Sequence, residues 1–261
     1  MLIDTHCHIH DPEFFTPAEA EAALERALQA GTGKIICVAT SLEDSKRAIA
    51  FAKAHPEHCW ATIGIHPHEV IKFSLAEIQD QLAALEKLAN DTKVVAVGEC
   101  GFDFYYNKKE TSLKLQTALL RGQIEIALRQ KLPLSFHVRA AFEEFWPIFE
   151  SYQQIKGVLH SFTDSPLNLE CAIKHKLLIG INGIATFTTK KWQSDLFQSI
   201  KDTNFILETD SPFLTPKPIR GNINSPENVI YITKYLAELR GESEEMIAKA
   251  TTANAESLFN L

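Results

Sequence analysis

The sequence has few cysteines and no close pairs of them. Its 261 residues contain five, scattered along the chain, and no two form a Cys-x-x-Cys pair. An odd number at such spacing predicts neither a disulfide framework nor a zinc site built from thiolates. We therefore expect free thiols in a reduced, cytoplasmic protein; the five are Cys7, Cys37, Cys59, Cys100 and Cys171.

Positive charge is also scarce. The chain has 26 Lys and Arg against 33 Asp and Glu, which gives a net charge of -7. This balance excludes a protein that coats nucleic acid or an anionic membrane by general electrostatics, although it allows a local site for an anion. No apolar stretch is long enough to span a membrane, and the start lacks the basic region of a secretory signal. We expect no membrane association and no obligate protein partner.

Short apolar runs and helical patterns alternate through the whole chain. Residues 16–19 form a capping box with Pro17 at the first helical position, and residues 74–77 begin a later helix in a similar way. We predict strands from Leu2 and over 34–38, 60–64, 94–97, 133–136, 157–159, 177–181 and 205–207. We predict helices over 17–30, 42–54, 75–88, 110–130, 141–152, 167–175, 193–200, 226–239 and 244–258.

These elements make about eight strand and helix alternations, which is typical of a parallel barrel. We predict an α/β fold, a TIM-like (β/α)8 barrel with allowance for distortion, as a single domain over residues 1–261. The near-continuous apolar strands fit burial on both faces. An open doubly wound sheet is the alternative, and the absence of a glycine-rich phosphate turn after the first strand disfavours it.

Metal-binding, acidic or basic side chains follow most of the predicted strands. In an extended chain Asp4, His6 and His8 share one face, so the two imidazoles can hold one ion from the same side. In a barrel, the residues just past the carboxyl ends of the strands form the site. His10, His55, His58 and His175 lie elsewhere and are expected to be solvated. The residues at the strand ends are His6, His8, His66, His68, Glu99, His137, His160 and Asp210.

Six segments in order resemble the TatD family of metal-dependent deoxyribonucleases, within the amidohydrolase-type barrels. This resemblance implies a TIM-like barrel, a divalent metal centre and hydrolysis of DNA phosphodiesters from the 3' end. By this match the metal-ligand positions are His6, His8, Glu99, His137, His160 and Asp210. Two departures, Asp164 and Ala141, lie outside those positions. The segments are Asp4-Thr-His-Cys-His8, Gly64-Ile-His-Pro-His68, Gly98-Glu-Cys-Gly-Phe-Asp103, His137-Val-Arg139, His160-Ser-Phe-Thr163 and Glu208-Thr-Asp-Ser-Pro-Phe-Leu-Thr-Pro216.

The six residues divide the work of a two-metal site. His6, His8 and Asp210 can hold one ion, and His137 and His160 can hold a second. Glu99 can give one oxygen to each, as a pair of ions about 3.5 to 4 Å apart requires. Asp210 is also our candidate general base, placed to orient the attacking water or take its proton. The alternative for Glu99 is a buried salt bridge with Arg139.

Phosphate and base contacts are less strongly indicated. Candidates for holding phosphate oxygens are His66, Arg139, Arg220 and, more weakly, Asn222. His66 could instead be a packing residue beside Pro67. The aromatic run 102–106 could stack a base, but at a barrel rim such residues more often cover the core, and we favour that interpretation.

The leading hypothesis is a phosphodiesterase with two divalent ions that acts on DNA ends or single-stranded DNA. The native ion is left open among Zn, Mn, Mg, Ni and Co. One alternative is a hydrolase of small esters, amides or lactones, because the same arrangement activates water for any of them. A second is a non-catalytic metal-binding scaffold.

Overall fold

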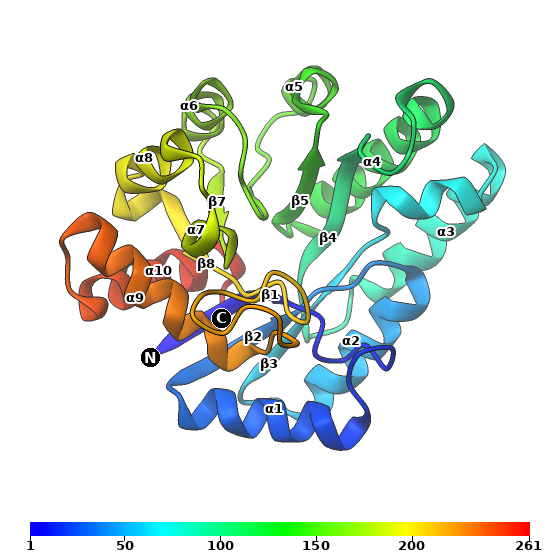
Figure 1. Cartoon of the computed structure of the whole chain (residues 1–261). Coiled ribbons are helices and arrows are strands. Elements are labelled where there is room, and N and C mark those ends of the chain that lie inside the picture. The colour runs from blue at the N-terminus through cyan, green and yellow to red at the C-terminus, as the bar shows by residue number, and fades with distance from the viewer.

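A computed structural model, which describes all residues 1–261, confirms the predicted (β/α)8 barrel. Eight parallel strands lie side by side in chain order, and the helices between them form the outer layer (Figure 1). The strands are β1 (Leu2–Cys7), β2 (Thr32–Cys37), β3 (Cys59–Ile63), β4 (Val94–Asp103), β5 (Leu134–Arg139), β6 (Gly157–Leu159), β7 (Leu178–Ile181) and β8 (Phe205–Leu207).

The predicted helices are present, with ends that differ by a few residues. Both predicted capping boxes form, at Thr16 and at Ser74, so local sequence determines where these helices begin. None of the helices combines the length and apolar character that a membrane crossing requires. The α-helices are α1 (Pro17–Gln29), α2 (Leu42–Ala54), α3 (Leu75–Leu88), α4 (Lys109–Gln130), α5 (Phe142–Glu150), α6 (Pro166–Lys174), α7 (Ile184–Phe187), α8 (Lys191–Ser199), α9 (Val229–Arg240) and α10 (Glu244–Phe259), with 3-10 turns η1 (Pro67–Lys72), η2 (Asp202–Asn204) and η3 (Pro226–Asn228).

Two strands are longer than the sequence pattern predicted. The apolar run of β4 stops at Gly98, but the strand continues to Asp103 after a register shift between Val97 and Cys100. This extension pairs Gly101 with His137, and β5 accordingly runs to Arg139. The sequence pattern did not indicate this extension, because its glycine and polar residues contribute backbone hydrogen bonds to the ladder but no apolar side chain.

The barrel closes through the segment that follows β8. Ser211 forms an isolated parallel bridge with Cys7 of β1, and the backbone N–H of His8 donates to the Ser211 carbonyl over 2.7 Å. The N–H of Asp210 donates to the carbonyl oxygen of His6 over 2.8 Å. The last strand-end segment is therefore joined directly to the first.

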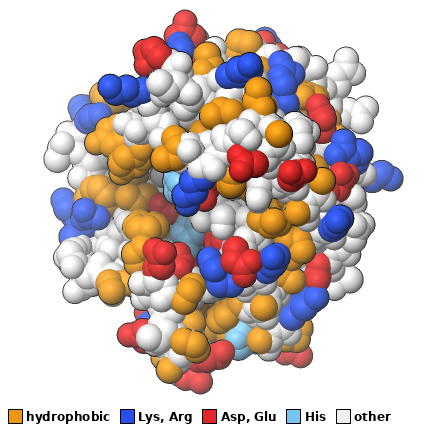
Figure 2. Space-filling view, turned by 90° about the vertical axis from the view of Figure 1, so that its right-hand side faces the viewer, with side chains coloured by type: hydrophobic (Ala, Val, Ile, Leu, Met, Phe, Trp, Pro, Cys, Tyr) orange, Lys and Arg blue, Asp and Glu red, His pale blue; other side chains and the backbone are white.

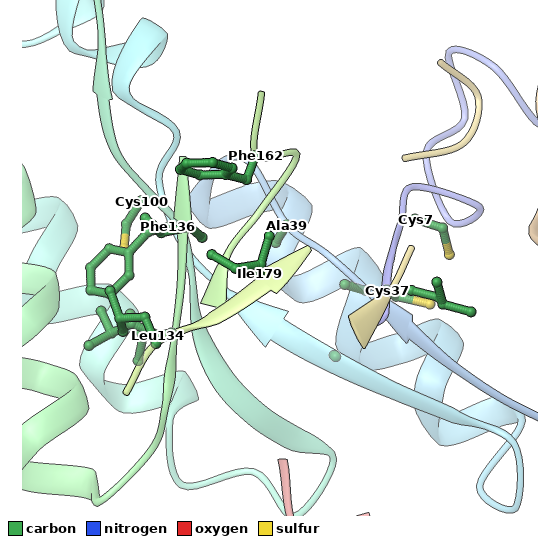
Figure 3. Close-up of a cluster of buried hydrophobic side chains, with 14 of the residues drawn as sticks. Cys7, Cys37, Ala39, Cys100, Leu134, Phe136, Phe162 and Ile179 are labelled. Atoms are coloured by element: carbon green, nitrogen blue, oxygen red, sulfur yellow. The ribbon is translucent and has the colours of Figure 1, made fainter. Parts of the chain in front are cut away.

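The interior is a packed hydrophobic core. Fifty-six buried residues form one hydrophobic cluster, and nine more, most of them from the strands, form a second. Figure 3 shows part of it, with Leu134 and Phe136 near Cys100 and, elsewhere, Cys7 near its register partner Cys37. All of β1 and β4 is buried, as burial on both faces requires. Polar side chains gather at the carboxyl ends of the strands, and a few others, such as Asp4 and Ser135, are buried within the strands.

Candidate metal centre

The carboxyl ends of the strands surround an open cavity of about 510 Å³. Figure 2 shows a recess on the face it presents, with pale-blue histidine side chains inside it. The predicted site residues that line the cavity are His8, His66, Glu99, His137, Arg139, His160 and Asp210. His6 lies beside these residues and is 1% exposed.

Glu99 of β4 lies among four imidazoles. Its carboxylate oxygens lie 2.6 Å from His137 Nδ1, 3.4 Å from His6 Nε2, 3.5 Å from His66 Nε2 and 3.8 Å from His160 Nε2. Burial alone would raise the pKa of Glu99, but His66, His160 and His137 outweigh it and hold the pKa well below its usual value. Glu99 is therefore a buried, charged carboxylate, and each of its two oxygens faces at least one imidazole.

Asp210 faces the same cluster from the segment after β8. Its Oδ1 lies 3.5 Å from His8 Nε2, 3.6 Å from His6 Nε2 and 3.8 Å from His160 Nε2. Burial would raise the pKa of this carboxyl, yet the field of His160 and the contact with His8 lower it. Asp210 has φ of 57°, which turns the chain at the point where it bridges to β1.

Three imidazoles have one ring nitrogen in contact with another group of the protein and the other turned to the carboxylates. His8 Nδ1 donates to the carbonyl oxygen of Val38 over 2.8 Å. His137 Nε2 lies 3.1 Å from Asp103 Oδ2, and His160 Nδ1 lies 3.0 Å from Glu208 Oε1. Such outer contacts fix the ring orientation and the tautomer of metal-binding histidines. The nitrogens that face Glu99 and Asp210 are therefore His8 Nε2, His137 Nδ1 and His160 Nε2.

The surroundings of the His6 ring indicate that a metal ion fits this site. Both of its ring nitrogens are buried without a hydrogen-bond partner, and its ring stacks on His160 with centroids 3.5 Å apart. Burial lowers the pKa of His6 and the neighbouring His160 lowers it further, which favours the neutral form that binds metal. Unpartnered buried nitrogens are costly, and a divalent ion would satisfy one of them. Imidazole with carboxylate is a donor set suited to Zn, Mn, Co or Ni.

The structure brings all six predicted ligands into one cluster. It also gathers sets whose donor atoms lie within 4.8 Å of one another, among them His6 with His8 and Glu99, and His66 with Glu99 and His137. His66, predicted as a phosphate contact, is thus close enough to Glu99 to be a further ligand candidate. Burial lowers its pKa to about 4, and its Nδ1 accepts the backbone N–H of His68 over 3.1 Å.

The other predicted substrate contacts separate into two groups. Arg139 lines the cavity and makes no ion pair with Glu99; its guanidinium lies 3.8 Å from the centroid of the Tyr105 ring. Arg220 and Asn222 do not line the cavity. Arg220 donates to the Thr215 carbonyl over 2.9 Å and packs on a phenylalanine ring, and Asn222 donates to a backbone carbonyl over 3.0 Å.

Sequence reasoning missed the residues that orient the ligands. Asp103 and Glu208 both stand in the motifs already singled out, and Asp103 has the same strand parity as Glu99, a usable signal. The Asp103 backbone is fixed from α4, where Gln116 Oε1 accepts its N–H over 2.9 Å. The expectation that His10 is solvated was wrong: it is buried, with Nε2 3.2 Å from Asp44 Oδ1.

The comparisons with known proteins cover the whole barrel. The model of the TatD-related DNase family matches residues 3–260. YabD of Bacillus subtilis, an uncharacterized metal-dependent hydrolase, is 32% identical over 263 residues, 100% of this chain and 100% of that one. The 3'-5' ssDNA/RNA exonuclease TatD of Erwinia tasmaniensis is 32% identical over 250 residues, 93% of this chain and 94% of that one. The crystal structure of YjjV, a TatD homologue from Escherichia coli K12, superposes with a TM-score of 0.90 at 32% identity, covering 100% of this chain and 98% of that one.

Proposed function

This chain belongs to the TatD-related DNase family, and on that premise we propose that it is a two-metal exonuclease that shortens single-stranded DNA from the 3' end. The observation that carries the proposal is the meeting of Glu99 and Asp210 with five imidazoles at one mouth of the barrel. A relative with the printed name of 3'-5' ssDNA/RNA exonuclease supports the polarity and the substrate class.

The ligand assignment follows the ring nitrogens that face Glu99 and Asp210. His6, His8 and Asp210 would hold one divalent ion and His137 and His160 a second, with Glu99 giving one oxygen to each. His66 stands close enough to Glu99 to complete the second set or to contact a phosphate oxygen. Bound ions of this kind neutralise a phosphate and lower the pKa of water, which is the chemistry that phosphodiester hydrolysis needs.

The protein residues supply the rest. The Asp210 carboxylate accepts the proton of the attacking water, because three neighbouring imidazoles lower its pKa against the effect of burial and keep it charged. Arg139 reaches into the cavity without an acidic partner, so its guanidinium can hold phosphate oxygens of the substrate. Arg220 and Asn222 stay predictions that require a movement of their loop.

The experiment is a nuclease assay with a 5'-labelled single-stranded oligonucleotide and added Mn²⁺ or Mg²⁺. We expect stepwise shortening from the 3' end, complete loss of activity in a chelator, and recovery when the divalent ion is restored. Duplex DNA, single-stranded RNA, a lactone and a small carboxylic ester form the comparison panel. Hydrolysis of the ester or lactone without any shortening of the oligonucleotide would instead favour the small-substrate hydrolase.

Location in a reducing cytoplasm stays a prediction, and it agrees with the five free thiols, four of them buried. We propose no obligate protein partner, since all six ligand candidates come from this one chain.

A further inference from the structure

We infer that two aromatic surfaces on opposite sides of the metal centre stack the bases next to the scissile phosphate. The tyrosine wall consists of Tyr105 and Tyr106 with Arg139, and the phenylalanine wall consists of Phe213 with Phe14. This inference rests on the proposed function and specifies its substrate: single-stranded nucleic acid whose unpaired bases can leave a helical stack. It also gives the exposed residues of the aromatic run 102–106 a role in base stacking, whereas the sequence pattern favoured a cover for the core.

The aromatic residues of the run 102–106 differ in burial. Phe102 is fully buried, in line with that interpretation, whereas Tyr105 and Tyr106 are 64% and 69% exposed. Tyr106 lines the cavity, and the Arg139 guanidinium lies 3.8 Å from the centroid of Tyr105 and 5.1 Å from that of Tyr106. The two exposed tyrosines, of which Tyr106 lines the cavity, therefore form a surface rather than a core cover.

The tyrosine wall is fixed to the metal centre. The backbone N–H groups of Tyr105 and Tyr106 both donate to Asp103 Oδ1, over 2.8 and 3.1 Å. The other oxygen of Asp103 lies 3.1 Å from His137 Nε2. One carboxylate thus sets both the position of a ligand imidazole and the position of the wall, which places a stacked base at a constant distance from the second ion site.

The phenylalanine wall stands on the segment that carries Asp210. Phe213 is 46% exposed, lines the cavity and donates its backbone N–H to the Asp210 carbonyl over 2.8 Å. Its ring lies edge-on to Phe14, with centroids 5.1 Å apart, and 6.2 Å from the ring of His8. The side chain of Asn224 holds the Phe213 carbonyl over 2.7 Å. This wall is therefore tied to the first ion site.

The strand order places the two walls across the mouth from each other. The tyrosine wall follows β4 and the phenylalanine wall follows β8, and these strands lie half-way round the ring from one another. A phosphate held at the proposed metal centre, between the two walls, would have the base on its 3' side against one wall and the base on its 5' side against the other. Arg139 combines a flat guanidinium and a positive charge without an acidic partner, which suits a nucleotide better than an apolar ligand.

The test compares two oligonucleotides of the same length. One carries normal bases throughout, and the other has abasic residues at its last two 3' positions. Stacking at one base is worth about five- to a hundredfold in affinity, so the wild type should prefer the normal substrate by at least about tenfold in kcat/KM. Phe213→Ala and Tyr106→Ala should each lower kcat/KM on the normal oligonucleotide, mainly through KM, and leave the abasic one nearly unchanged. Phe213→Trp should retain the preference.

Trp192→Ala is the matched control, because Trp192 is 42% exposed and does not line the cavity. This variant should leave kcat/KM unchanged on both oligonucleotides. Thermal unfolding should show that all variants fold. If kcat/KM of the Phe213→Ala and Tyr106→Ala variants fell equally on both oligonucleotides, or did not fall on the normal one, the inference of base stacking would be wrong. Failure of the wild type to shorten either oligonucleotide would overturn the proposed function itself.

Discussion

The backbone N–H of Asp210 donates to the carbonyl oxygen of His6 over 2.8 Å, and this contact joins the two ends of the sheet. It also brings the Asp210 carboxylate to 3.6 Å from His6 Nε2. The closure of the barrel and the assembly of the metal centre are therefore one structural event. A substitution at Asp210 that keeps its backbone intact should consequently separate catalysis from folding.

Asp210→Asn should abolish most activity without unfolding the barrel. The amide retains the shape of the side chain but cannot accept a proton, and general base catalysis contributes about 10²- to 10⁴-fold. We expect kcat for the oligonucleotide to fall by at least that range while the melting temperature changes by only a few degrees. An Asp210→Asn variant with wild-type kcat would remove this residue from the mechanism.

Glu208→Gln should weaken metal binding although Glu208 is not among the predicted ligands. Glu208 Oε1 lies 3.0 Å from His160 Nδ1 and accepts the backbone N–H of Ser161 over 2.6 Å, so it orients the imidazole. Burial would lower the pKa of His160, but Glu208, Glu99 and Asp210 raise it to about 10, so an ion must displace a proton from this imidazole to bind it. Loss of such an orienting contact costs about 10- to 100-fold in metal affinity.

Competition with a chromogenic chelator measures that loss independently of activity. Glu43→Gln is the matched control, because its carboxylate is 67% exposed and lies on the outer helix α2. Equal metal affinity in the Glu208 variant and the control would show that Glu208 has no orienting role.

Gly101→Ala should disturb both the fold and the metal centre. Gly101 has φ of 150°, and a Cβ there would meet the carbonyl oxygen of His137 at 1.9 Å. Strands β4 and β5 must separate to admit the methyl group, which moves His137 away from Glu99; overpacking of this kind costs about 1 to 3 kcal/mol. We expect a lower urea midpoint together with weaker metal binding.

Gly241→Ala separates the clash from the backbone strain. Gly241 also has a positive φ, 67°, but its Cβ would meet nothing within 4 Å. This variant should lose a similar or smaller amount of stability and keep wild-type metal affinity. If Gly101→Ala retains wild-type affinity as well, the close contact of β4 and β5 does not position His137.

The sequence predicted the fold, and it predicted which residues gather at the proposed metal centre, because both depend on local signals. Capping boxes marked Thr16 and Ser74, and apolar runs marked strands whose ends meet at one mouth in any barrel. The extension of β4 escaped prediction because Gly98 and Gly101 resemble strand ends. Which polar groups orient the ligands depends on side-chain contacts between distant strands, such as Glu208 with His160, and spacing alone does not contain them.

The residues predicted to contact phosphate show the same limit of prediction from sequence. Arg139 was predicted from its place after a strand end, and it lines the cavity. Arg220 was predicted from a loop motif, and its guanidinium contacts Phe187 and Thr215 instead. Loop conformation follows from tertiary contacts, so a residue in a long loop is harder to place than one at a strand end.

The number of divalent ions bound per chain tests the central claim most directly. Wild-type protein and Glu99→Ala would each be loaded with Mn²⁺ or Zn²⁺, desalted and assayed by plasma mass spectrometry, with circular dichroism to confirm folding. We predict two ions per wild-type chain and at most one in Glu99→Ala, because Glu99 is the residue that we propose gives one oxygen to each ion. A wild type that binds fewer than two ions, or a Glu99→Ala variant that keeps two, would contradict the account.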